Sequence, residues 1–154
     1  LVMHAAATAV ARRLSMRPVQ GLFDVVVTTG AGHPLDRNLR QSVEGLSAAA
    51  EVVKPGGVII CAAECRDGFP GHTFYPEVFT SALSSRVLLD AIAGRARIVV
   101  YSTGLGAADL AAVHLRHTDD VAAAARAALD KAGPGARLCV LPEGPRTIPY
   151  VETL

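Results

Sequence analysis

The fold of this chain is decided by one stretch of its sequence, FDVVVTTGAGHPLDRNLRQSVEGLSAAAEVVKPGGVIICAA (residues 23–63). It opens with the continuous apolar run Phe23–Thr29, which predicts a strand buried on both faces. Apolar residues at helical spacing then predict a helix over residues 37–53. They are Leu39, Val43, Leu46, Ala50 and Val53. The run Lys54–Gly57 ends this helix, and Gly56–Ala63 predicts a second buried strand, which completes a strand–helix–strand unit of a parallel sheet.

The rest of the chain repeats this alternation of apolar runs and helical segments. Further strands are predicted at Ala96–Ser102, Ala112–His117 and Ala136–Pro142, of which the second is half polar and weaker. Further helices are predicted at about residues 4–15, 76–92, 105–111 and 119–132. The predicted fold class is therefore α/β, doubly wound, with a mostly parallel sheet of about five strands and helices on both faces.

We expect residues 1–154 to form a single domain, because there is no internal repeat and no linker-like tract. The last segment, EGPRTIPYVETL (residues 143–154), shows no periodicity. It is expected to lie extended across the surface or against a partner.

The composition excludes several classes of function. Hydrophobic residues make up 51% of the 154 residues and charged residues only 19%, which excludes a disordered chain. A net charge of +1 excludes a nucleic-acid-binding protein that works by bulk electrostatics. No stretch approaches the roughly 20 apolar residues that cross a bilayer. We therefore expect a folded domain with neither a nucleic acid nor a membrane as its partner.

The chain has three cysteines, Cys61, Cys65 and Cys139. This small and odd number does not form a disulfide framework, and it fits a reducing compartment. No signal peptide is visible in the first 20 residues, so a cytoplasmic location is predicted. Only Lys54 and Lys131 of the 15 basic residues are lysines, a bias typical of GC-rich bacterial genomes. The opening LVMHAAATAVARRL runs straight into a helical pattern without a leading methionine, and we interpret it as a cut through a larger protein.

The loop after the first predicted strand is the first candidate for chemistry, since ligands of open parallel sheets bind beyond the carboxyl ends of the strands. Thr29, Gly30, Gly32 and His33 offer backbone N–H groups and polar side chains there. Leu35 stands where the third glycine of a dinucleotide-binding fingerprint belongs. Both a tight turn and an anion-binding loop fit this pattern, and the tight turn is favoured. Asp36 is predicted to be the N-cap of the following helix.

Two other loops follow predicted strands. In the segment Ala62–Tyr75, Cys65 and His72 fit either a nucleophile with its base or a buried thiol with a loop histidine, and the second reading is favoured. The segment Ser102–Gly106 is a candidate ligand-binding loop only because it follows a predicted strand. The remaining histidines, His4, His114 and His117, do not form a set of metal ligands, so no metal site is predicted within this chain.

One group of residues is expected on the outer side of the helix over residues 37–53. At 100° per residue, Gln41 and Glu44 lie opposite the apolar stripe, where a partner domain could dock or solvent could cover them.

The run from Asp24 to Tyr75 resembles the C-terminal domain of the nickel-dependent lactate racemase family. The matching features are the glycine-containing loop, Pro34-Leu35-Asp36, Asn38, Gln41, the glycine pair, and the loop that reaches Phe74. The closing VLPEGPRTIPYV (residues 140–151) is similar to the family's end, so the resemblance covers about residues 20–150.

The resemblance implies that the chain is the C-terminal domain of a larger two-domain enzyme that racemises or epimerises 2-hydroxy acids. The family uses a nickel pincer nucleotide that takes up the α-hydride of the substrate and returns it to either face. The cofactor-bonding lysine, the nickel-ligand histidine and the catalytic histidines belong to an N-terminal domain, so the resemblance implies no catalytic residue and no bound cofactor in this chain alone. Its expected partners are that N-terminal domain and a small 2-hydroxy acid.

The C-terminal domain of the family contributes substrate contacts from the helix after its first strand, which are a glutamine and, three residues later, a lysine. Gln41 matches the glutamine, whereas Glu44 stands at the lysine position. This charge reversal predicts a substrate other than lactate, such as one with a cationic or hydroxyl-rich tail, and Arg40 is a candidate replacement cation.

Two other functions fit the sequence. One is an ordinary nucleotide-binding domain that uses the same glycine loop, and the other is a non-catalytic sensor or oligomerisation domain that has kept only the fold.

Overall fold

The computed structural model describes residues 2–68 and 78–152. Its centre is a five-stranded sheet in the order β5-β4-β3-β2-β6, in which every neighbouring pair is parallel. The strands are β2 (Phe23–Thr29), β3 (Val53–Ala62), β4 (Arg97–Tyr101), β5 (Arg116–His117) and β6 (Leu138–Leu141). The helices are α1 (Val2–Ser15), α2 (Leu39–Val52), α3 (Val78–Arg95), α4 (Ala107–Ala112) and α5 (Val121–Ala132).

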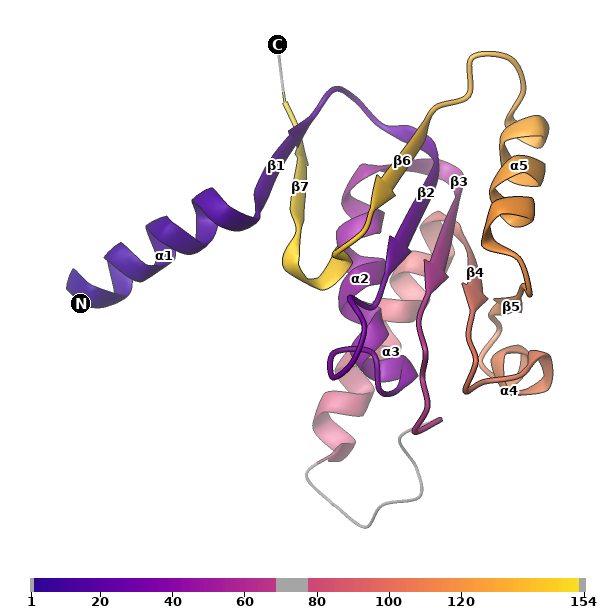
Figure 1. The fold of residues 1–154 in the computed structure, drawn as a ribbon, viewed down its shortest axis with the longest axis horizontal. Coiled ribbons are helices and arrows are strands. Elements are labelled where there is room, and N and C mark those ends of the chain that lie inside the picture. Colours follow the sequence, from indigo (N-terminus) through magenta and orange to yellow (C-terminus); the bar gives the residue numbers. More distant parts are fainter. Residues whose placement is uncertain (1, 69–77, 153–154) are drawn as a thin grey trace.

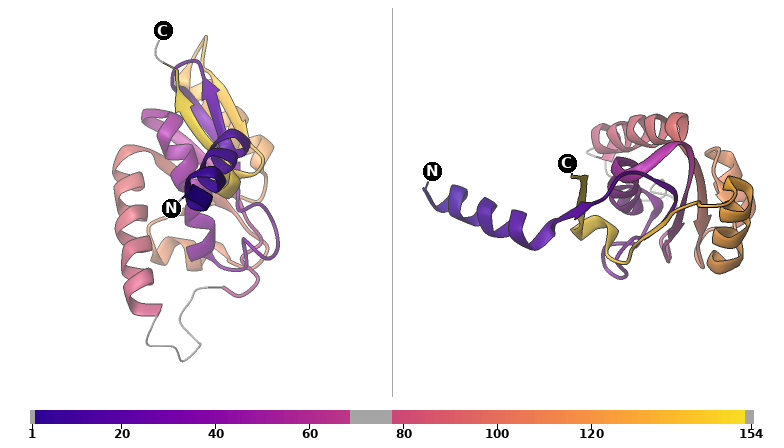
Figure 2. Two further views of the ribbon diagram at one scale, coloured as in Figure 1. Left: turned by 90° about the vertical axis from the view of Figure 1, so that its left-hand side faces the viewer. Right: turned by 90° about the horizontal axis from the view of Figure 1, so that it is seen from above.

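Helices cover both faces of the sheet (Figures 1 and 2). On one face, α2 and α3 pack over Val26, Ile59 and Ile98, which are paired across the strands and buried. On the other face, Ala125 of α5 packs over Val25 and Ile60. Because both faces are covered, the middle of each central strand, residues 25–27 in β2 and 58–61 in β3, is apolar. The predicted doubly wound α/β class is confirmed, and the sheet is wholly rather than mostly parallel.

Several predicted boundaries shift by a few residues. The helix predicted over 37–53 is Leu39–Val52, and β3 begins at Val53 instead of Gly56. The strand predicted at Ala112–His117 is reduced to Arg116–His117, because α4 runs to Ala112 and His114 has a φ of 62°, which no strand residue adopts. The helix predicted from residue 76 is Val78–Arg95, and its predicted first two residues lie outside the described part of the chain.

The sequence did not predict a second sheet, in which β1 (Met16–Val19) pairs in parallel with β7 (Ile148–Val151). The tail is extended, as expected, but it is a strand preceded by a short 3₁₀ helix, η1 (Gly144–Arg146). Pro18 and Pro149 lower the strand signal of both segments, because proline has no N–H to donate to a ladder. The partners are also more than a hundred residues apart, so only the tertiary structure brings them together.

Helix α1 projects away from the body of the domain (Figure 1). Met3, Val10 and Leu14 are 87%, 49% and 69% exposed. An amphipathic helix normally buries its apolar residues, so this one leaves apolar surface uncovered within the described residues.

The start of β2 is tied to its neighbours by Asp24. Its carboxylate accepts hydrogen bonds from Lys54 Nζ at 2.8 and 2.9 Å and from the Arg137 amide at 2.8 Å. The hydrogen bond from Lys54, followed by that from the Arg137 amide, lowers the pKa of Asp24 below its ordinary value of 3.8. A lowered pKa means that the folded state prefers the ionised carboxylate.

We expect Asp24→Asn to lower the free energy of unfolding at pH 7, and we expect this loss to disappear in acid. The pKa of Asp24 is lower in the folded than in the unfolded state. Its contribution is therefore fully present above about pH 4 and is lost as the pH falls through the folded-state pKa. Urea unfolding of both proteins at pH 7, 5 and 3 measures the difference. Asp130→Asn, at an exposed position of α5, is the matched control. A difference that stays constant from pH 7 to pH 3 contradicts the expectation.

Candidate functional site

The carboxyl ends of β2, β3 and β4 meet at one edge of the sheet, and backbone hydrogen bonds join the three loops that follow them. The Cys65 amide donates to the Asp36 carbonyl at 2.9 Å, and the Gly104 amide donates to the Glu64 carbonyl at 2.8 Å. Ser102 Oγ also donates to the Glu64 carbonyl at 2.8 Å. The described parts of the three segments singled out by position in the sequence, residues 29–36, 62–68 and 102–106, are therefore joined at this edge of the sheet.

The loop after β2 is a tight turn. Ala31 and Gly32 both have positive φ, at 63° and 73°, and the Leu35 amide donates to the Gly32 carbonyl at 2.8 Å. Thr29 Oγ1 accepts from the Ala31 amide at 2.9 Å and donates to the Pro142 carbonyl at 2.6 Å. The Thr29 hydroxyl is thus committed to the loop and to the end of β6, whereas Gly32 and His33 are exposed.

Gly30 is required by close packing. A Cβ at this position would collide with the side chain of Asp36, so the loop folds directly onto that residue. This contact explains the glycine without a phosphate and favours the tight-turn reading of the Gly-x-Gly pattern.

The predicted capping role of Asp36 is wrong. The N-cap of α2 is Asn38, whose Oδ1 accepts from the Gln41 amide at 3.1 Å. Asp36 is instead buried, and its Oδ2 accepts from the Glu64 amide at 2.9 Å, which links two of the loops. Asparagine and aspartate are about equally good N-caps, so the local sequence did not distinguish the two positions.

Two buried oxygen atoms at this edge lack a hydrogen-bond partner among the described residues. They are Asp36 Oδ1 and Gln41 Oε1. Gln41 lies in the first turn of α2 and is half-buried as a whole. A buried acceptor without a donor costs free energy in the folded state, so these atoms are positions where the donor of a ligand or partner would be favourable.

Arg40 and Glu44 lie on the same helix but do not pair. No ion pair between described residues joins them. Arg40 is half-buried and Glu44 is exposed. Glu44 borders a shallow hollow of about 340 Å³ between α2, η1 and β7, together with Ser47, Glu51 and Thr147. This hollow therefore combines carboxylates with hydroxyl groups.

Cys65 is a buried thiol, as the favoured reading expects. Its Sγ lies 3.7 Å from Ser42 Oγ, and its side chain is fully buried. Burial raises the pKa of this thiol, although its side-chain hydrogen bonds with Ser42 and Ser102 oppose the shift. A raised pKa leaves little thiolate for nucleophilic attack. His72, its suggested base, lies outside the described residues.

The other candidate side chains do not come together in a site among the described residues. Ser102 Oγ accepts from the amides of Gly104 and Leu105, both at 3.2 Å, and so closes its own turn. His4 and His114 are exposed, and His117 Nδ1 lies 3.7 Å from Asp119. Within residues 2–68 and 78–152, no group of three or more His, Cys, Asp or Glu side chains could hold a metal, and no helix is long and apolar enough to span a bilayer.

Two glycines that were not predicted from the sequence allow close packing beside the site. Gly45 of α2 lies against the Thr29 carbonyl, which leaves no room for a Cβ. Gly144 of η1 is packed among Thr28, Thr29 and Gly45 in the same way. A helical glycine seven residues after the N-cap was the available signal for such a close approach.

Fold and site together define a doubly wound α/β domain whose candidate ligand groups lie at the carboxyl ends of its strands. The family model of the lactate racemase C-terminal domain matches residues 20–97, about half of the chain. The chain belongs to this family, as its resemblance predicted.

Individual relatives agree with this assignment. The lactate racemase of Lactiplantibacillus plantarum is 30% identical over 141 residues, which cover 79% of this chain and 33% of that protein. The lactate racemase of Thermoanaerobacterium thermosaccharolyticum is 54% identical over 52 residues, which cover 34% of this chain and 12% of that protein. The apoprotein structure from the same organism superimposes with a TM-score of 0.78 at 22% identity, over 97% of this chain and 40% of that one. The chain thus spans well under half of the length of these relatives.

Proposed function

We propose that this chain is the substrate-binding lid domain of a larger 2-hydroxy acid racemase or epimerase. The main support for the proposal is the position and environment of Gln41. It stands where the family has its substrate-binding glutamine, and its amide oxygen is buried without a partner among the described residues. The hydroxyl group of a 2-hydroxy acid substrate would supply the missing donor.

The partner in this proposal is the protein's own N-terminal domain. The length of the relatives supports it, as does the apolar surface of α1, which the rest of the described chain leaves uncovered. A cytoplasmic location also belongs to the proposal and is consistent with three free cysteines.

The nickel pincer nucleotide, when bound, would supply a reversible acceptor for the hydride on the substrate's α-carbon. We assign the nickel ligands to the N-terminal domain, as the family resemblance implies; the described residues of this chain hold no group of three or more His, Cys, Asp or Glu side chains that could bind a metal. What this chain contributes is positioning. The Gln41 amide would orient the substrate, and the loops joined through Asp36 would close over it and exclude water.

The substrate of the proposed enzyme is a 2-hydroxy acid other than lactate. Glu44 replaces the family's lysine and would repel a carboxylate. The neighbouring Glu51, Ser47 and Thr147 favour a cationic or hydroxyl-rich tail in the same hollow. Arg40, which has no ion pair with Glu44, is the proposed cation for the substrate carboxylate.

The test uses the full-length protein loaded with its cofactor and a panel of 2-hydroxy acids and sugar acids, with the stereoisomers resolved by chiral chromatography. We expect epimerisation of at least one member that carries hydroxyl or amino groups. Absence of epimerisation across the whole panel would overturn the proposal.

We expect Glu44→Lys to raise kcat/KM for lactate by about tenfold or more, because it restores a cation where the family has one, and one charge-assisted hydrogen bond contributes about 1.5–3 kcal/mol. Glu51→Lys is the matched control, since it makes the same charge change one α2 heptad further along the same hollow. Chiral assay of both variants of the full-length protein decides the matter. An equal gain in kcat/KM for the Glu51→Lys control would show that the effect comes from the overall change in charge. No gain for Glu44→Lys would show that Glu44 does not select the substrate.

A further inference from the structure

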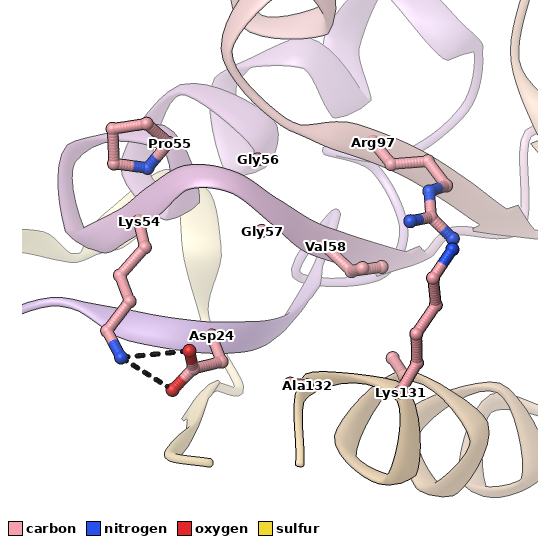
Figure 3. A pocket seen from close by; sticks show the side chains of 10 residues that line it. Asp24, Lys54, Pro55, Gly56, Gly57, Val58, Arg97, Lys131 and Ala132 are labelled. Atoms are coloured by element: carbon pink, nitrogen blue, oxygen red, sulfur yellow. Dashed lines mark hydrogen bonds and ion pairs between the residues drawn. The ribbon is translucent and has the colours of Figure 1, made fainter.

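A second hollow, of about 250 Å³, lies at the opposite end of the strands, between the start of β3, the start of β4 and the last turn of α5 (Figure 3). The space exists because small residues surround it. Gly56 and Gly57 line it from β3, and Ala128 and Ala132 line it from α5. A Cβ at Gly57 would lie 2.8 Å from the Asp24 carbonyl oxygen, so the packing of β3 on β2 leaves no room for a side chain at this position.

The charges around this hollow do not balance. Three cationic side chains line it, Lys54, Arg97 and Lys131, and they include both lysines of the chain. Among the described residues, Asp24 is the only carboxylate that lines it, and Asp24 accepts hydrogen bonds from Lys54 and from the Arg137 amide. Two positive charges are therefore left uncompensated.

Arg97 and Lys131 are the uncompensated pair. Arg97 comes from β4 and Lys131 from α5, and their side chains point toward one another across the hollow (Figure 3). Neither has an ion pair with any described acidic residue. Two like charges held face to face repel each other unless an anion lies between them.

We propose that this hollow binds a phosphate group, held between Arg97 and Lys131. A phosphate near neutral pH carries close to two negative charges, which match the two uncompensated cations. The planar guanidinium of Arg97 can donate to two phosphate oxygens at once, and the Lys131 ammonium adds a point charge. The volume suits inorganic phosphate or the phosphate end of a small metabolite and is below the usual range for larger ligands.

The experiment titrates inorganic phosphate into the full-length protein in a phosphate-free buffer of low ionic strength and measures binding by calorimetry. We expect saturable binding that Lys131→Gln and Arg97→Gln each weaken about tenfold or more, since each removes a charge-assisted contact. Lys131 is exposed, so its replacement tests the site even if Arg97→Gln fails to fold. Arg126→Gln, an equal charge change at an exposed position of the same helix but outside the hollow, is expected to stay within twofold.

Two further ligands identify what is recognised. Methyl phosphate that binds at least as tightly as inorganic phosphate indicates a phosphorylated metabolite, and weaker binding indicates the free ion; both support the site. Malonate, a dicarboxylate of equal charge, is expected to bind at least tenfold more weakly. Equal binding of malonate, no saturable phosphate binding, or an Arg126→Gln effect as large as that of Lys131→Gln would overturn the proposal.

Discussion

Replacing Gln41 by methionine in the full-length, cofactor-loaded protein is expected to lower kcat/KM by about 100-fold while the free energy of unfolding stays the same or rises. The loss follows from the proposed hydrogen bond to the substrate, because about 2–3 kcal/mol of transition-state binding corresponds to that factor. The stability result has a different cause. The Gln41 oxygen is buried without a partner among the described residues, and an apolar side chain of similar length removes this unpaired acceptor.

The two measurements together separate a substrate contact from a structural residue. Steady-state kinetics on the full panel of substrates gives the first, and urea unfolding gives the second. Gln20→Met is the matched control, because Gln20 is the only other glutamine in the chain and is exposed between β1 and β2. Full activity of Gln41→Met, or a loss of activity that merely follows a loss of stability, would show that Gln41 does not bind the substrate.

Replacing Gly45 by alanine is expected to destabilise the domain by about 3 kcal/mol or more, the upper range for overpacking. An alanine in the middle of a helix normally stabilises it by up to about 1 kcal/mol relative to glycine. Here the added methyl group would meet the Thr29 carbonyl oxygen, which is backbone and cannot turn aside. The sign of the effect is therefore opposite to that of helix propensity.

Gly94 of α3 provides the control. It is also a helical glycine, but nothing lies within 4 Å of the position its Cβ would take. We expect Gly94→Ala to be neutral or stabilising by up to about 1 kcal/mol. Thermal and urea unfolding of both variants measure the difference, and two changes of the same sign would contradict the close approach of α2 to β2.

The core of the fold could be predicted because it depends on local patterns of apolar residues. The runs Phe23–Thr29 and Gly56–Ala63 are apolar on both faces, and only a parallel sheet covered on both sides buries such strands. The apolar stripe of α2 then required the helix to lie on that sheet. The family resemblance similarly rested on short motifs, and the match over residues 20–97 confirms it.

The candidate site was predicted less completely, because its residues act through neighbours that are distant in the sequence. Gln41 was identified by resemblance, but its unpaired buried oxygen is a property of the packed structure. Asp36 was assigned to the wrong role, because its partner is the Glu64 amide, 28 residues away. Local propensity contains no information about such a contact.

The sequence by itself determined the class of fold, the order of the central strands and helices along the chain, and the family, since hydrophobic periodicity and short motifs are local properties. Only the tertiary structure decided that β1 pairs with β7, that Gly45 and Gly144 permit α2 and η1 to approach β2, and that Arg97 and Lys131 face one hollow. The physical reason is the same in each case. Close packing and charge balance depend on atoms that the folded chain brings together from separate elements.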